Sequence, residues 1–265
     1  MTQISRFRST AGLVLSVLLM AGCASSPDTW TVRTSSTPLP LSSDPDLVSL
    51  EQEAVGLLTP LATPALRGNE VALSRYLDDI IKKIVPTWKV IDEQQTINLI
   101  NRYGLAGEYA RLRESGEQSH ILDRELLQKI GKSIEARYVF QPRLAFILQT
   151  MTDRLNLPPF DILIMQTRAA HMRLSLQLWD TMSGELIWAS AAEIALQSEA
   201  VTQDPVFMED AARIGWGSML SDLLNGKTSS RYTRLNRFLD DLLSEKTNET
   251  PRGESYQGQI PEYWQ

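Results

Sequence analysis

The chain has 265 residues, of which 43% are hydrophobic and 22% are charged, a composition typical of a globular protein. Its formal net charge is −6, and it becomes −8 without residues 1–22, whose only charged side chains are Arg6 and Arg8. An acidic chain lacks the basic surface by which proteins bind nucleic acids, so no nucleic-acid partner is expected.

The N-terminal residues combine a basic start with an apolar run over residues 11–20 and the tripeptide Ala21-Gly22-Cys23. A run of about 7–15 apolar residues before small residues is typical of a secretory signal, whereas a spanning helix needs about 20. The end of this signal resembles a bacterial lipobox, with Met20 in place of the more usual leucine. The resemblance implies that residues 1–22 are removed and that Cys23 receives an S-diacylglycerol group and an N-acyl chain. The alternative is an ordinary signal peptide with an incidental cysteine.

The residues after Cys23 bear on which membrane holds the anchor. Ala24 and Ser25 are not the acidic retention signal of inner-membrane lipoproteins in enteric bacteria, so the resemblance implies the outer membrane, on its periplasmic side. Several acyl chains together anchor a protein stably, whereas one chain alone is marginal. Because Cys23 is the single cysteine, no disulfide is expected.

Composition divides the rest of the chain into three parts. Residues 23–49 are rich in Ser, Thr, Pro and Asp, which predicts a disordered tether. Residues 50–230 alternate strand and helix patterns, which predicts a single periplasmic α/β domain. Residues 231–265 are expected to form a C-terminal helix and a polar tail.

Strand and helix patterns alternate in the first half of this domain. The apolar spacing predicts a strand over 53–62, a helix over 69–85, a strand over 88–92, and helices over 93–105 and 122–135. Asn69 is the expected N-cap of the first helix, and Pro86 ends it.

Strands dominate the second half. Residues 136–148 predict a long strand in which Pro142 indicates an edge or a bulge. In the next strand, apolar Met172, Leu174, Leu176 and Leu178 alternate with Arg173, Ser175, Gln177 and Trp179, the pattern of a strand with one face on the core. A turn over 180–184 leads to an antiparallel strand over 185–196, and a helix is expected over 204–226.

The order of three sequence stretches resembles a known family. "VIDEQQTINLI", "IGKSIEARYVF" and "LWDTMSGELIW" are similar to segments of the periplasmic domain shared by CsgG, LpoB and the TolB amino-terminal domain. Arg137 replaces a usual acidic residue, and Ser183 replaces a usual threonine. Over residues 53–226 the resemblance implies a three-layer-like α/β domain, a mixed β-sheet flanked by helices, that works in the cell envelope.

Two connections differ from those of the curli channel, which inserts two long hairpins into the membrane. Residues 149–170 hold Pro158-Pro159 in their middle, and residues 197–204 are too few for two spanning strands. A self-made pore is therefore not expected. The segment 157–165 is predicted to be a covering loop or a partner-binding edge, with Leu157, Phe160, Ile162 and Ile164 as the partner surface.

No catalytic, metal-binding or cofactor-binding residues are predicted. His120 and His171 have no metal-ligand spacing, and no G-x-S-x-G, P-loop or G-x-G-x-x-G motif is present. The chain is therefore interpreted as a lipid-anchored docking module whose partner is an envelope protein. The alternatives are a component that forms a homo-oligomeric ring in a secretion or assembly complex, and an enzyme with an unrecognised site.

Overall fold

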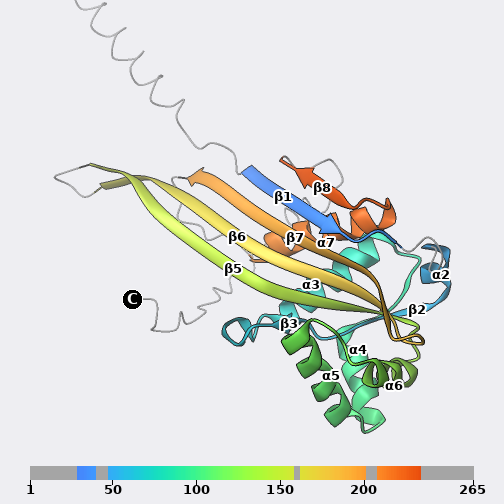
Figure 1. Cartoon of the computed structure of the whole chain (residues 1–265). Helices are drawn as coiled ribbons and strands as arrows, with labels where there is room; N and C mark the ends of the chain where they lie inside the picture. Colours follow the sequence, from blue (N-terminus) through green and yellow to red (C-terminus); the bar gives the residue numbers. More distant parts are fainter. Residues whose placement is uncertain (1–28, 40–46, 158–161, 201–207, 234–265) are drawn as a thin grey trace, which may run out of the picture.

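The computed structural model describes residues 29–39, 47–157, 162–200 and 208–233, and these form one mixed eight-stranded sheet with helices on both faces (Figure 1). The α/β class with a mixed sheet flanked by helices is thus confirmed. The strands are β1 (Thr29–Ser36), β2 (Ala54–Leu57), β3 (Leu61–Ala62), β4 (Lys89–Ile91), β5 (Tyr138–Leu157), β6 (Ile162–Asp180), β7 (Glu185–Ala200) and β8 (Ser229–Tyr232). The helices are α2 (Leu47–Gln52), α3 (Glu70–Ile84), α4 (Glu93–Arg102), α5 (Ala106–Ser119), α6 (Arg124–Ile134) and α7 (Met208–Leu224), with a 3₁₀ turn at Pro64–Leu66.

The strand order is β4-β2-β5-β6-β7-β1-β8, and β3 pairs with β5 beyond the end of β2. The pairs that β2 makes with β4 and β5 are parallel, as is the β3–β5 pair, whereas all pairs from β5 to β8 are antiparallel. Parallel neighbours need a crossover connection, and helices α3 to α6 lie in these connections. Antiparallel neighbours need only a turn, which residues 181–184 supply between β6 and β7.

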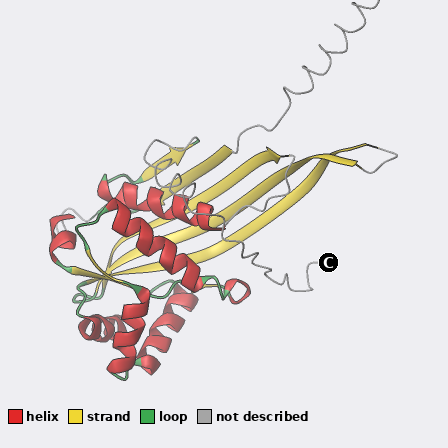
Figure 2. Ribbon diagram, turned by 180° about the vertical axis from the view of Figure 1, so that it is seen from behind, coloured by secondary structure: helices red, strands yellow, loops and turns green. Residues whose placement is uncertain are grey.

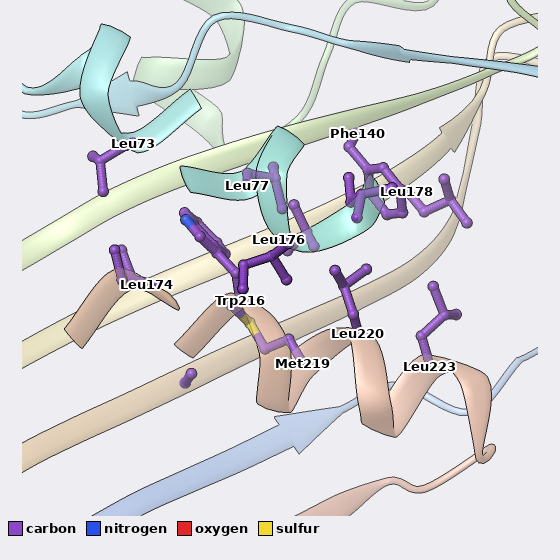
Figure 3. Close-up of a cluster of buried hydrophobic side chains, with 14 of the residues drawn as sticks. Leu73, Leu77, Phe140, Leu174, Leu176, Leu178, Trp216, Met219, Leu220 and Leu223 are labelled. Atoms are coloured by element: carbon purple, nitrogen blue, oxygen red, sulfur yellow. The ribbon is translucent and has the colours of Figure 1, made fainter. Parts of the chain in front are cut away.

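Helices α3 and α7 cover one face of the sheet and enclose the larger core (Figures 2 and 3). The predicted alternation in β6 is confirmed, because Met172, Leu174, Leu176 and Leu178 are buried under these helices. Gly215 allows α7 to approach the sheet, since a Cβ there would lie 2.8 Å from the Leu174 Cδ1 atom. Other large buried side chains of this core include Leu73, Leu77, Phe140, Trp188, Trp216, Met219, Leu220 and Leu223.

Helices α4, α5 and α6 cover part of the opposite face, at the end of the sheet near β2 (Figure 1). Their buried side chains, among them Leu127 and Ile130, form a second core with Val139 and Trp179. Helix α5 was not predicted, because its sequence "AGEYARLRESGEQS" has few apolar positions. Its buried Tyr109 and Leu112 nevertheless give it an inner face.

Pro142 lies inside β5, opposite Leu176 of β6, where the other neighbour changes from β2 to β3. The backbone N–H of Leu58 donates to the Phe140 carbonyl, so residues 140 and 142 direct their backbone groups toward the β2–β3 side. The missing N–H of proline therefore faces the gap between β2 and β3. The buried Gln141 side chain bridges this gap, because its Nε2 atom donates to the carbonyls of Thr59 (2.9 Å) and Pro142 (3.0 Å). Pro142 itself pairs in regular register with Leu176, and a bulge follows between Leu144 and Phe146.

Three expectations on secondary structure are wrong. Within the predicted disordered tether over 23–49, residues 29–36 instead form β1, in which Val32 and Thr34 are buried against α7 while the strand pairs with β7 and β8. The covering loop over 157–165 is contradicted by the β5–β6 hairpin, whose pairing continues to Leu157 and Ile162. A helix cannot begin at residue 231, because Arg231 belongs to β8. In β1 and β8, pairing with a neighbouring strand overrides a composition rich in Ser, Thr and other polar residues.

Candidate docking surface

A large part of the sheet face opposite α7 has no helix over it among the residues that the structure describes (Figure 1). We call this surface the open face and define it by the outward side chains of β1, β5, β6, β7 and β8 beyond the region covered by α4, α5 and α6. Figure 2, turned by 180°, shows α3 and α7 in front of the same strands. The open face therefore lies on a rigid layer whose other side is the main core.

A row of charged side chains crosses the open face. The register aligns Arg231 of β8, Arg33 of β1, Glu193 of β7, Arg173 of β6 and Phe146 of β5. Directly opposed residues on neighbouring strands point to the same side, so these five side chains form one ladder. With three arginines and one glutamate, the row is locally basic in a chain whose net charge is negative.

Arg173 and Glu193 form an ion pair through the Arg173 Nη2 and Glu193 Oε1 atoms. The hydrogen bond from Arg173 holds the pKa of the Glu193 carboxyl below its ordinary value, and the charges of Arg173 and Arg33 act in the same direction. Both side chains are at least half exposed. An exposed pair of this kind contributes little to stability, so its effect is to fix the positions of charged groups on the surface.

A second row adds apolar surface next to the charges. The register places Thr31, Ala195, His171 and Leu148 side by side. Phe146 and Leu148 are 46% and 41% exposed, which is unusual for side chains of their size on a sheet. A shallow depression of about 650 Å³ lies over these two rows and includes Arg33, Phe146, His171 and Ala195 in its lining. Such a surface offers both apolar contact and charge to a partner.

The sequence of β7 explains why the open face is shallow. Its outward positions beside Glu193 are Ala189, Ala191 and Ala195, whose methyl groups barely cover the backbone. The inward positions include the buried Trp188 and Ile194, which pack toward α7. Sequence reasoning missed this surface because alanine fits either face of a strand. The sequence pattern did assign Arg173 to the outward face of its strand. Its neighbours Arg33 on β1 and Glu193 on β7 could not be identified without the strand register.

The sequence-predicted site residues have different outcomes. Cys23 and Phe160 lie outside the described residues. Leu157, Ile162 and Ile164 lie in the strands at the far end of the β5–β6 hairpin, where Leu157 and Ile162 are the last pair. Their side chains are outside the description, so the partner surface there stays a prediction.

The two histidines lie apart. His120 follows α5 in the left-handed conformation (φ 61°), and its Nδ1 atom contacts the Arg143 guanidinium. His171 lies on the open face. No group of three or more His, Cys, Asp or Glu side chains that could hold a metal ion occurs in the described ranges. No helix within them is long and apolar enough to cross a bilayer.

Comparison with known proteins gives similarities of fold at low identity and low TM-score. No family model matches the sequence, and no curated protein matches it. The structure is similar to those of bacterial envelope lipoproteins. One is the LpoB C-terminal domain from Escherichia coli, with 14% identity and a TM-score of 0.34 over 53% of this chain and 81% of that chain. Lipoprotein GNA1162 from Neisseria meningitidis has 11% identity and a TM-score of 0.38, and the match covers 65% of this chain and 96% of that chain.

The PelC dodecamer from Paraburkholderia phytofirmans is also similar, with 12% identity and a TM-score of 0.32 over 72% of this chain and 96% of that chain. LpoB is among the proteins to which the sequence resemblance pointed. At these identities the likeness concerns the fold alone.

Proposed function

We propose that the protein is a docking module of the cell envelope, lipid-anchored to the outer membrane through Cys23 on its periplasmic side, and that its open face binds an envelope protein. The observation that carries the proposal is the open face itself. Exposed Phe146 and Leu148 lie beside the arginine row, on a sheet whose reverse side packs on the main core.

The chemistry of the open face indicates what kind of partner fits. Arg33, Arg173 and Arg231 against Glu193 favour an acidic segment, and the apolar side chains next to them favour one that also carries hydrophobic residues. The rigid sheet means that little conformational freedom is lost when the partner binds, which raises affinity.

Photo-cross-linking in the native envelope tests this proposal. A photoreactive amino acid in place of Ala195 should cross-link to a partner protein, and the yield should fall when Arg173→Glu is added or when salt is raised. The same amino acid in place of Arg75, which is exposed on α3 at the opposite side of the sheet, is the matched control. Equal cross-linking yields from the two positions would contradict docking at the open face. A cross-linking yield from Ala195 that does not change when Arg173→Glu is added would also contradict it.

One observation favours the ring-forming alternative. Strand β5 pairs with β3 only up to Leu144, and in the described residues the edge of β5 beyond that point has no strand beside it. A free strand edge can accept a strand from another chain. Measurement of the particle mass in mild detergent separates the two proposals, because a ring requires many copies and a docking module requires one.

A further inference from the structure

A groove of about 430 Å³ lies between helices α3 and α4, which precede and follow the edge strand β4. Its α3 wall includes Val71, Ser74 and Asp78, and its α4 wall includes Glu93 and Ile97. Residues three or four positions apart lie on the same side of a helix, so each wall is one stripe of side chains. The volume suits a small ligand, and no residue of the open face belongs to the described lining.

Three groups in this lining have no hydrogen-bond partner among the described residues. Ser74 is only 3% exposed and Glu93 only 8% exposed, yet the hydroxyl of the first and the carboxylate of the second make no hydrogen bond or ion pair with a described residue. The buried Oδ1 atom of Asp78 also lacks a partner, whereas the Asp78 Oδ2 atom accepts a hydrogen bond from Lys82 (2.6 Å). Buried polar groups are almost always hydrogen-bonded. Oxygen acceptors without donors at three positions of one groove therefore point to a ligand that supplies the donors.

The charges of the lining favour a cation. Asp78, Asp92 and Glu93 provide three carboxylates, and the exposed Arg75 is the one basic side chain in the described lining. Lys82 lies outside this lining and pairs with Asp78, so Asp92 and Glu93 outnumber Arg75. Lys82 also shows how these carboxylates act on an ammonium group, because its hydrogen bond to Asp78 raises the pKa of Lys82 above its ordinary value and the charges of Asp78 and Asp92 act in the same direction. A positively charged ligand is therefore favoured over a neutral or anionic one.

We propose that the groove between α3 and α4 binds an organic cation, a primary ammonium or guanidinium group on a short apolar stem. An ammonium group has three N–H donors and no acceptor, and a guanidinium group has five donors and no acceptor. Either group supplies the donors that Ser74, Asp78 and Glu93 lack, and hydrogen bonds between charged partners are stronger than neutral ones. The stem has apolar surface to contact at Val71 and Ile97, which are 56% and 37% exposed. This inference goes beyond docking at the open face and does not depend on it.

An NMR titration of the purified full-length chain, in a buffer free of amines and at fixed ionic strength, tests the proposal. The probes are cadaverine, which has ammonium groups on an apolar stem, agmatine, which adds a guanidinium group, and tetramethylammonium, which has the charge but no N–H donor. We expect cadaverine and agmatine to shift the methyl signals of Val71 and Ile97 with saturation. Tetramethylammonium should bind on the order of tenfold more weakly, because it donates no hydrogen bond.

Two variants and a matched control locate the site. Glu93→Gln keeps the shape of the side chain without its charge and should weaken cadaverine binding on the order of tenfold or more. Ser74→Ala should weaken it about threefold, and alanine is well tolerated inside a helix. Asp79→Asn changes the net charge as Glu93→Gln does, but Asp79 pairs with Arg213 of α7 (3.2 Å) and is not part of the described lining. The affinity of the Asp79→Asn variant for cadaverine should therefore stay within about twofold.

The outcomes decide both the chemistry and its source. Cadaverine binding that Asp79→Asn weakens as much as Glu93→Gln would reduce the effect to net charge and overturn the site. Lack of saturation by both amines, or saturation by Mg²⁺ in their place, would also overturn it. N-acetyl-lysine methylamide carries the same ammonium group on a peptide unit, so tighter binding of this probe than of cadaverine would assign the groove to a lysine side chain of a partner, and weaker binding would assign it to a free amine. Photo-cross-linking from Ala195 reports on the open face alone, so failure of either proposal leaves the other standing.

Discussion

Replacement of Leu176 by alanine tests the position of the main core. The Leu176 side chain is fully buried in β6 beneath α7, close to Trp216 (Figure 3). Its cross-strand neighbours are Pro142 and Ser190, and neither can expand to fill the space that alanine would leave. We therefore expect Leu176→Ala to lower the free energy of unfolding by about 2–5 kcal/mol through lost burial and a residual cavity.

Gln177→Ala is the matched control on the opposite side of the same strand. An outward side chain on a strand would by itself contribute almost nothing to the free energy of unfolding. The Gln177 Nε2 atom, however, donates to the His120 carbonyl (3.2 Å), and the Gln177 Oε1 atom accepts a hydrogen bond from Trp179 Nε1 (3.2 Å). Loss of these bonds should reduce the free energy of unfolding by about 1 kcal/mol. Urea denaturation of both variants, with an unchanged m-value, measures the two losses. Equal losses would refute the assignment of one strand face to the main core.

Three further predictions concern a buried carboxylate, the charged row and the anchor. Asp222 of α7 is fully buried and accepts hydrogen bonds from Thr34 of β1 and from Ser230 of β8 (2.6 Å). Thr34→Val should therefore lower the free energy of unfolding by about 1.5–3 kcal/mol, as measured by urea denaturation. A loss smaller than that of Thr37→Val would contradict the link between Thr34 and Asp222. Because the pKa of Glu193 is lowered in the folded state, its ion pair contributes fully to stability at pH values above the ordinary carboxyl pKa. This contribution is lost as the pH falls through the pKa of the folded state. Arg173→Gln should therefore raise the Glu193 pKa in an NMR titration, and an unchanged value would refute the pairing. Cys23→Ser should release the protein from membranes after a high-salt wash, whereas continued flotation with vesicles would refute the lipobox.

The sequence predicted those elements whose periodicity is strong. Helix α3 and the turn between β6 and β7 were located within a few residues, because the flanking apolar positions repeat at 3.6 and 2.0 residues. The first half of β6 was missed, since the strand begins at Ile162 and the alternation was recognised only from Met172. Strand β1 was missed because, of its residues 30–36, only Val32 and Thr34 are buried, and this burial becomes visible only once β7 lies beside the strand. Helix α5 was missed for a similar reason, since Tyr109 makes its main contact with Thr59, 50 residues away.

The open face could not have been predicted from the sequence for a different reason. Its charged row joins residues from β1, β5, β6, β7 and β8, between positions 33 and 231, and a shift of one residue in any pair would send that side chain to the opposite face. The lipobox, in contrast, is a continuous motif that needs no register. A motif of consecutive residues could therefore be predicted from the sequence, whereas a surface formed by residues from several strands could not.

The position of β1 changes what a deletion near the N-terminus should do. If residues 23–49 were a free tether, removal of residues 27–46 would leave the domain intact and only shorten its reach. This deletion instead removes β1 between β7 and β8, together with Val32 of the core and Thr34, which contacts Asp222. We therefore expect the deletion variant to unfold at a lower temperature or to fail to fold, as measured by circular dichroism.

A matched insertion separates the reach of the anchor from the stability of the fold. Only five residues lie between Cys23 and Thr29, so an acylated Cys23 would hold the start of β1 within about 20 Å of its acyl chains. A flexible insertion after Ser26 should leave the melting temperature unchanged, because it precedes the strand. If partner capture from Ala195 then falls, the partner lies near the membrane. If the deletion of residues 27–46 left the melting temperature unchanged, β1 would not be an integral strand of the sheet.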